Sequence, residues 1–237
     1  MNMTRTRSFG RAVTAHPQAV SLADTPVRMA FLRKVYSLFT FAMLLFSGVT
    51  YWASTSEWAF QLMAKMGFIG LIVLMIGVFI LARATAARFP LNLIGLGAFA
   101  AVYGFLAGPQ VAMALEVGGP AVVLQAAVLT SVVFLGLTSY VLLTKKDFSW
   151  MRGALWAGFA LMFGIAILSM FGIGGSLVSG MGWSIAWVLL MAGFMLYDTS
   201  NILHRYPADQ AASAALTIFI DFVIMFLHIL RLLARRD

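Results

Sequence analysis

The chain has 237 residues, of which 62% are hydrophobic and 10% are charged, and its formal net charge at pH 7 is +8. Soluble domains average about 25% charged residues, so this composition excludes an ordinary water-soluble domain. The lack of cysteine excludes disulfides, thiol catalysis and thiolate metal sites. Nucleic-acid binding is not expected either, because the basic residues lie at the ends of apolar segments, where they orient membrane proteins.

The first 28 residues are polar and basic, and they contain no apolar stretch that could form the core of a signal peptide. This composition predicts a disordered cytosolic tail. Residues 29–237 are expected to form one membrane domain, because no connection between their apolar segments is long enough for a second domain.

Apolar segments fill the rest of the chain. A helix needs roughly 20 mainly apolar residues to cross a bilayer. Uncharged stretches cover residues 35–56, 66–82, 89–115, 119–144 and 153–197. The last stretch has room for two helices, and the glycines at 172, 174 and 175 predict a turn inside it. A final stretch at 210–230 contains only two ionisable residues. We therefore predict an all-α membrane protein with seven transmembrane helices.

The distribution of lysine and arginine indicates the orientation. With the N-terminus in the cytoplasm, twelve of the 16 basic residues lie on the cytoplasmic side and four on the other. Basic residues favour the cytoplasmic side, so this orientation is preferred. Six spans followed by a re-entrant segment at 210–230 remain an alternative, and they would place the C-terminal arginines inside.

Two acids, Asp198 and Asp221, lie within the last two predicted helices, while the other six lie in the tail or near the ends of helices. Pro207 predicts the turn between these helices. The two acids are equidistant from the point between Asp209 and Gln210. Because an α-helix rises 1.5 Å per residue, an antiparallel hairpin places them at a similar depth.

Two carboxylates at one depth repel each other by about 4 kcal/mol at about 4 Å and an effective dielectric of about 20. The expected state near neutrality is one proton shared by the pair. Asp198 and Asp221 therefore form a candidate proton sensor and a candidate site for transient Ca²⁺, whose preferred ligands are oxygens. No resident cofactor is expected. In the alternative interpretation, local hydroxyls satisfy the acids, which merely tie the helices together; these hydroxyls belong to Tyr197, Thr199, Ser200 and Thr217.

Arg83 ends the second predicted helix on the same side as Asp198, and its side chain is long enough to reach inward. It is a candidate latch that closes a salt bridge with Asp198, or else a simple anchor at the membrane surface. His228 lies about 10 Å along the last helix from Asp221. We interpret it as an interior or interfacial residue and not as a ligand.

An enzyme is not expected. A zinc site needs about three suitably spaced ligands, and the three histidines, at positions 16, 204 and 228, do not provide that spacing. The glycines are not followed by the Gly-Lys-Ser/Thr of a phosphate-binding loop. No lysine lies in the last predicted helix, which excludes a retinal protein.

Several blocks together resemble the Bax inhibitor/YccA-like (transmembrane Bax inhibitor motif-containing) family of seven-span membrane proteins. These blocks are FLRKVY at 31–36, YVLLTKKDFS at 140–149, LYDTSNI at 196–202, ALTIFIDF at 215–222 and FLHILRLL at 226–233. The resemblance implies a fold in which six helices surround a central seventh helix. In calcium-leak members two acids on the last two helices form a proton-sharing sensor, and an arginine on the second helix latches one of them. These roles fall on Asp198, Asp221 and Arg83.

The YccA-like branch resembles this chain most around residues 145–149 and 198–204. That branch is associated with the membrane AAA protease FtsH, which it modulates as a substrate. Its archetype carries Glu and Ser at the positions of the two acids, whereas this chain has both aspartates. We therefore expect a pH-sensitive Ca²⁺ leak protein of a bacterial inner membrane, with the lipid bilayer, Ca²⁺ and H⁺ as its partners. The alternative is an FtsH modulator without ion flux of its own.

Overall fold

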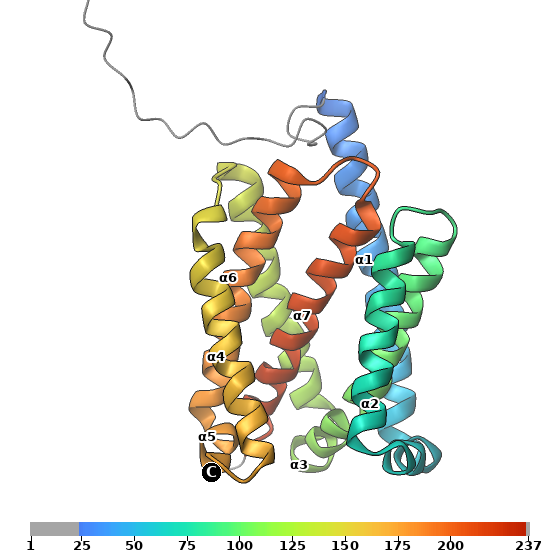
Figure 1. Cartoon of the computed structure of the whole chain (residues 1–237), viewed down its shortest axis with the longest axis vertical. Helices are drawn as coiled ribbons and strands as arrows, with labels where there is room; N and C mark the ends of the chain where they lie inside the picture. Colours follow the sequence, from blue (N-terminus) through green and yellow to red (C-terminus); the bar gives the residue numbers. More distant parts are fainter. Residues whose placement is uncertain (1–23, 236–237) are drawn as a thin grey trace, which may run out of the picture.

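A computed structural model describes residues 24–235, and the elements in that range are helices. They are α1 (Thr25–Thr55), α2 (Glu57–Thr85), α3 (Leu91–Thr144), the short 3₁₀ helix η2 (Ser149–Met151), α4 (Arg152–Met170), α5 (Gly175–Ser179), α6 (Met181–Arg205) and α7 (Ala211–Leu233) (Figure 1). Residues 1–23 of the predicted tail, with His16, lie outside the described residues. Residues 25–28, which we assigned to the tail, belong to α1, where Pro26 occupies the first turn that proline favours.

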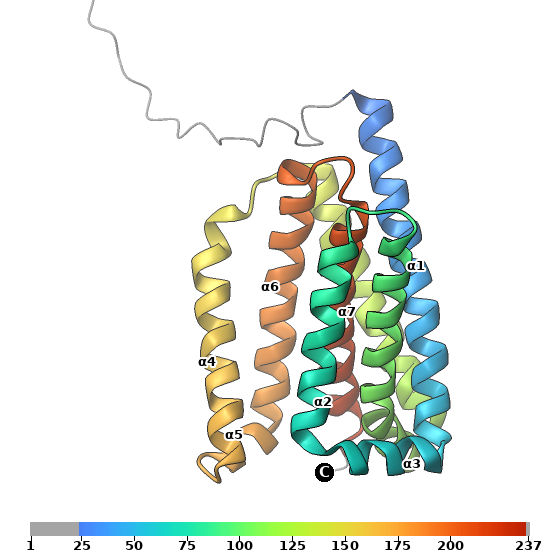
Figure 2. The ribbon, with the colours of Figure 1, turned by 45° about the vertical axis from the view of Figure 1, so that its right-hand side comes forward.

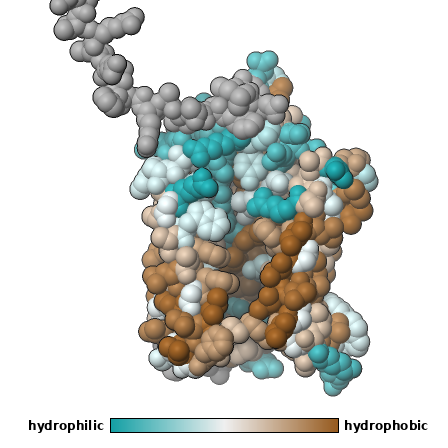
Figure 3. All heavy atoms as spheres, in the orientation of Figure 1, coloured by the Kyte–Doolittle hydropathy of each residue, from teal (hydrophilic) through white to brown (hydrophobic). Residues whose placement is uncertain are grey.

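Six of the described helices are long and apolar enough to cross a membrane: α1, α2, α3, α4 together with η2, α6 and α7. The face seen in Figure 3 is largely apolar below its hydrophilic upper end. Large side chains on these helices, such as Ile69 and Leu143, are 77% and 81% exposed. An apolar surface of this extent is stable in lipid and not in water. The chain is therefore a multi-pass membrane protein.

Helix α3 does not run straight. Its 54 residues would extend about 80 Å as one rod, well over twice the thickness of the hydrocarbon core. The backbone leaves helical geometry at Gly119, where φ is 67°, and the chain folds back on itself there (Figures 1 and 2). Gly67, with φ 63°, bends α2 in the same way, so its first turns cross the end of the bundle. Glycine adopts a positive φ without steric cost.

Helix α7 is the most buried of the six candidate spans: 56% of its apolar window is buried, against 44% for α6 and none for α2. It packs against α1, α2, α3 and α6. Phe219 is fully buried and meets the ring of Phe46 edge to face at 5.8 Å and that of Phe99 at 6.0 Å. This packing fixes the rotation of α7 about its own axis and therefore determines which of its residues face α6.

Candidate functional site

The structure brings Asp198 and Asp221 together. Residues 206–210 connect α6 to α7, so Asp198 lies two turns before the end of α6 and Asp221 about three turns into α7. Their carboxyl groups line the same cavity and are close enough to interact electrostatically. A carboxylate only accepts hydrogen bonds, so a bond between the two requires that one of them carries a proton.

Neighbouring hydroxyls do not satisfy these acids. Asp221 is 5% exposed, and its Oδ2 has no hydrogen-bond partner among the described residues. The buried hydroxyl of Thr199 likewise lacks a partner there, and the hydroxyl of Thr217 donates to the carbonyl of Ser213 at 3.0 Å. The alternative in which Thr199 and Thr217 cap the acids therefore does not describe the observed contacts.

Both acids line a cavity of about 410 Å³ between α2, α4, α6 and α7. One part of its wall is polar and includes Arg83, Asn201 and Thr217, and another part is apolar and includes Met191 and Ile224. Figure 3 shows a hollow in the centre of the face that α2, α6 and α7 share, with hydrophilic residues inside it. The acid pair thus adjoins a space large enough for several water molecules or a hydrated ion.

Arg83 reaches this cavity, but it does not form the salt bridge with Asp198 that we expected. Among residues 24–235 the one ion pair within 4.0 Å joins Arg205 and Asp147. The Arg83 guanidinium lies over the Phe79 ring at 5.4 Å, and its Nη2 donates to the Thr217 hydroxyl at 3.4 Å. Phe79, one turn earlier on α2, directs the guanidinium toward α7. Arg83 therefore contacts the hairpin one turn before Asp221 and acts on Asp198 through its charge.

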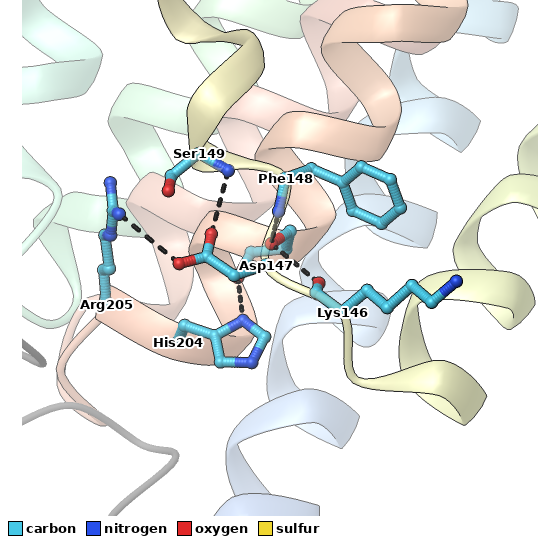
Figure 4. A network of polar contacts seen from close by, with 7 residues as sticks. Lys146, Asp147, Phe148, Ser149, His204 and Arg205 are labelled. Atoms are coloured by element: carbon cyan, nitrogen blue, oxygen red, sulfur yellow. Dashed lines mark hydrogen bonds and ion pairs between the residues drawn. The ribbon is translucent and has the colours of Figure 1, made fainter. Parts of the chain in front are cut away.

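A second polar cluster was missed by sequence reasoning, which placed Asp147 merely near the end of a span. Figure 4 shows it between the connection after α3 and the last turns of α6. Asp147 accepts a hydrogen bond from the backbone N–H of Ser149 at 2.8 Å and pairs with Arg205 at 3.7 Å. The Ser200 hydroxyl accepts from the backbone N–H of Phe148 at 3.0 Å and donates to the carbonyl of Lys146 at 3.2 Å. This cluster fixes the last turns of α6, from Ser200, two residues beyond Asp198, to Arg205.

The environment of Asp147 favours its charged form. Partial burial by itself raises the pKa of this carboxyl. The N–H and hydroxyl of Ser149 and the charges of Arg205 and His204 outweigh that effect and lower the pKa below its ordinary value. The spacing Asp-x-Ser indicates the local turn, since aspartate side chains commonly accept from the N–H two residues on. No local sequence pattern predicts that Asp147 pairs with Arg205.

His204 and His228 lie in different environments. His204, near the end of α6, has its Nδ1 2.8 Å from the carbonyl of Ser200. His228 lies inside the bundle, its ring stacked on that of Trp187 at 5.4 Å and 10°. Its Nδ1 is buried and has no hydrogen-bond partner among the described residues. His228 is thus partly buried, which fits our interpretation of it as an interior or interfacial residue.

Residues 28–237 match the sequence profile of a protein family described as "Inhibitor of apoptosis-promoting Bax1". The chain is 32% identical over 227 residues to Protein lifeguard 4 of Mus musculus, which covers 90% of this chain and 88% of the relative. It is 31% identical over 217 residues to Bax inhibitor 1 of Schizosaccharomyces pombe, covering 87% and 77%. An uncharacterized membrane protein of Vibrio cholerae is 33% identical over 159 residues, covering 67% and 70%.

Proposed function

Because the chain belongs to the Bax inhibitor-1/YccA-like family of membrane proteins, we propose that it is a pH-sensitive cation leak protein with Ca²⁺ as its ion. The Asp198–Asp221 pair is its proton sensor and transient cation site. One observation carries this proposal: two neighbouring carboxyl groups share the wall of a cavity of about 410 Å³ inside a membrane protein. Acids at membrane depth are costly and are typical of ion and proton pathways.

The proposed architecture has seven membrane crossings around α7. Helix α3 contributes two of them, one on each side of Gly119, which its length of 54 residues supports. The high burial of α7 supports its place as the central helix. The distribution of lysine and arginine supports a cytoplasmic N-terminus, and the bacterial relative supports a bacterial inner membrane.

The proton on the acid pair controls the contact between α6 and α7. With one proton present, the carboxyl groups of Asp198 and Asp221 hydrogen-bond and hold the helices together. Loss of that proton leaves two negative charges that repel each other in a medium of low dielectric and attract a divalent cation. The amide oxygen of Asn201, on the same cavity wall, is a further oxygen ligand. Helix α2, the least buried span, is the element that moves most easily to admit the ion.

Ca²⁺ flux into proteoliposomes, measured across a pH series, tests this function. Asp221→Asn and Asp198→Asn remove the shared proton, so the dependence of flux on pH is expected to flatten in both. Asp209→Asn is the matched control, since Asp209 is an exposed acid in the connection of the same hairpin. A wild-type pH profile in both cavity variants contradicts the proposal.

The second candidate is a YccA-like modulator or substrate of the membrane AAA protease FtsH, without ion flux of its own. The hydrogen bonds of Ser200 with Lys146 and Phe148 favour it, because they join the two blocks that resemble that branch. Deletion of residues 1–27 is then expected to abolish co-purification with the protease while the pH profile of any flux stays unchanged. Full-length protein that never co-purifies with the protease contradicts this function.

A further inference from the structure

Helices α6 and α7 pack against each other in antiparallel orientation, so their side chains meet in successive layers along the contact. On α7 the residues Asp221, Ile224 and His228 share one face, because they are three and four positions apart. Asp221 meets Asp198, Ile224 and Met191 both line the cavity, and His228 stacks on Trp187. An apolar layer formed by Met191 and Ile224 therefore separates the acid pair from His228.

Beyond this layer lie two polar atoms whose hydrogen-bonding capacity is unused among the described residues. They are Nδ1 of His228 and the hydroxyl of Ser184, which is fully buried one turn from Trp187 on α6. Most buried polar atoms in proteins have a partner, either protein or water. These two atoms lie on the same two helices as the acid pair. Their unused hydrogen-bonding capacity favours a route for water and protons between α6 and α7 over a purely hydrophobic contact.

The stack on Trp187 leaves Nδ1 of His228 available for a proton. The nearest charged residue on its own helix is Arg231, one turn further on, whose guanidinium donates to the carbonyl of Val178 in α5. On α6 the only acid is Asp198, and on α3 the only charged residue is Glu116. Helix α1 has none after Lys34, and α2 has Glu57, Lys65 and Arg83. Asp221 is thus the acid on the face of α7 that His228 occupies.

We propose that His228 is a second proton-binding residue of the pathway, on the side of the Met191–Ile224 layer away from the acid pair. This inference rests on the proposed function. When water wets the layer, the shared proton leaves the carboxyl pair and binds Nδ1. The O–H bond of the acid pair breaks and an N–H bond forms, so a second carboxylate and an imidazolium result. The proton then leaves toward the end of α7, past Ser184. The stack on Trp187 keeps the imidazole ring in position throughout.

Flux measurements with the pH of each face set independently test the position of His228. The chain has no cysteine, so Asp209→Cys labelled with a membrane-impermeant thiol reagent reports the orientation of the protein in the vesicles. His228→Gln and His228→Phe are both expected to lose the response to pH on the face where α7 ends. They are expected to keep the response on the face of the α6–α7 connection. Wild-type responses in His228→Phe, which retains an aromatic stack, overturn the proposal.

Nuclear magnetic resonance of the full-length protein in nanodiscs, with ¹⁵N-labelled histidine, gives an independent readout. The chain has three histidines, and the spectrum of His228→Gln identifies the signal of His228 by difference. This signal is expected to titrate with a midpoint that shifts in Asp221→Asn, because the proton equilibria of the two residues are coupled. An unchanged midpoint overturns the inference. If flux does not respond to Asp221→Asn while the midpoint shifts, the leak function fails and the proton site on His228 stands.

Discussion

Arg205 at the end of α6 pairs with Asp147 in the connection after α3, at 3.7 Å (Figure 4), two turns beyond Asp198 on the same helix. Because Ser200 bonds to the same connection, the last two turns of α6 are attached to it at two points. The position of Asp198 relative to Asp221 therefore depends on a contact outside the cavity. Changes at Asp147 test this dependence without touching the acid pair.

Asp147→Asn is expected to lower the free energy of unfolding by about 0.5–1 kcal/mol, the usual value of a partly exposed ion pair. The amide oxygen of asparagine still accepts from the N–H of Ser149, so only the charge pairing with Arg205 is lost. Asp147→Ala removes that hydrogen bond as well and is expected to cost about 1 kcal/mol more. Thermal unfolding in one detergent measures both variants, with Asp209→Asn as the control. Equal stability of all three contradicts a structural role for the cluster.

The cluster also predicts how stability depends on pH. Because the folded state lowers the pKa of Asp147 below its ordinary value of 3.8, the unfolded chain binds this proton more readily. The stabilising contribution of Asp147 is therefore fully present above pH 3.8 and is lost as the pH falls below that value toward the folded pKa. Unfolding measured between about pH 6 and pH 3 is expected to show a smaller acid-induced loss in Asp147→Asn than in the wild type. Parallel curves contradict this assignment.

Sequence reasoning located the acid pair because the rise of an α-helix is constant and the hairpin connection is short. The observed connection is 206–210, so the distances of Asp198 and Asp221 from it differ by about one turn, and the two acids still lie at similar depths. The salt bridge between Arg83 and Asp198, one of two interpretations of Arg83, is not observed within 4.0 Å among residues 24–235. The guanidinium instead lies over Phe79 and donates to Thr217, and sequence cannot choose among acceptors that a long side chain can reach. The pairing of Asp147 with Arg205 depends on how distant helices pack, which no local pattern encodes.

Close packing of α1 against α3 depends on Gly104. A Cβ at this position would lie 2.7 Å from the backbone oxygen of Phe46, which cannot move without displacing α1. Gly104→Ala is therefore expected to destabilise the protein by about 1–3 kcal/mol, as overpacked cores do. Gly136→Ala is the matched control, because a Cβ there meets nothing within 4 Å and alanine favours the helix. Thermal unfolding measures both variants, and the melting temperature is expected to fall only in Gly104→Ala. Equal melting temperatures contradict the packing argument.

Thr217→Val tests the hold of Arg83 on α7. Valine keeps the shape of threonine but offers no oxygen to the guanidinium of Arg83 or to the hydroxyl of Tyr206, each 3.4 Å from Thr217 Oγ1. A hydrogen bond contributes about 0.5–1.5 kcal/mol net. We expect this contact to stabilise the closed state, in which α2 stays packed against α7. Its loss then raises the fraction of molecules open to the ion by about two- to tenfold, since 1.4 kcal/mol is a factor of ten.

Ca²⁺ flux at fixed pH measures this change, with Thr130→Val as the control. The hydroxyl of Thr130 bonds only to the carbonyl of Ala126 in its own helix and lies outside the cavity, so its removal is not expected to alter flux. A rise in Thr217→Val alone assigns the effect to the contacts of the Thr217 hydroxyl with Arg83 and Tyr206. Equal flux in the two variants contradicts the idea that the contact between Arg83 and Thr217 restrains the movement of α2 that admits the ion.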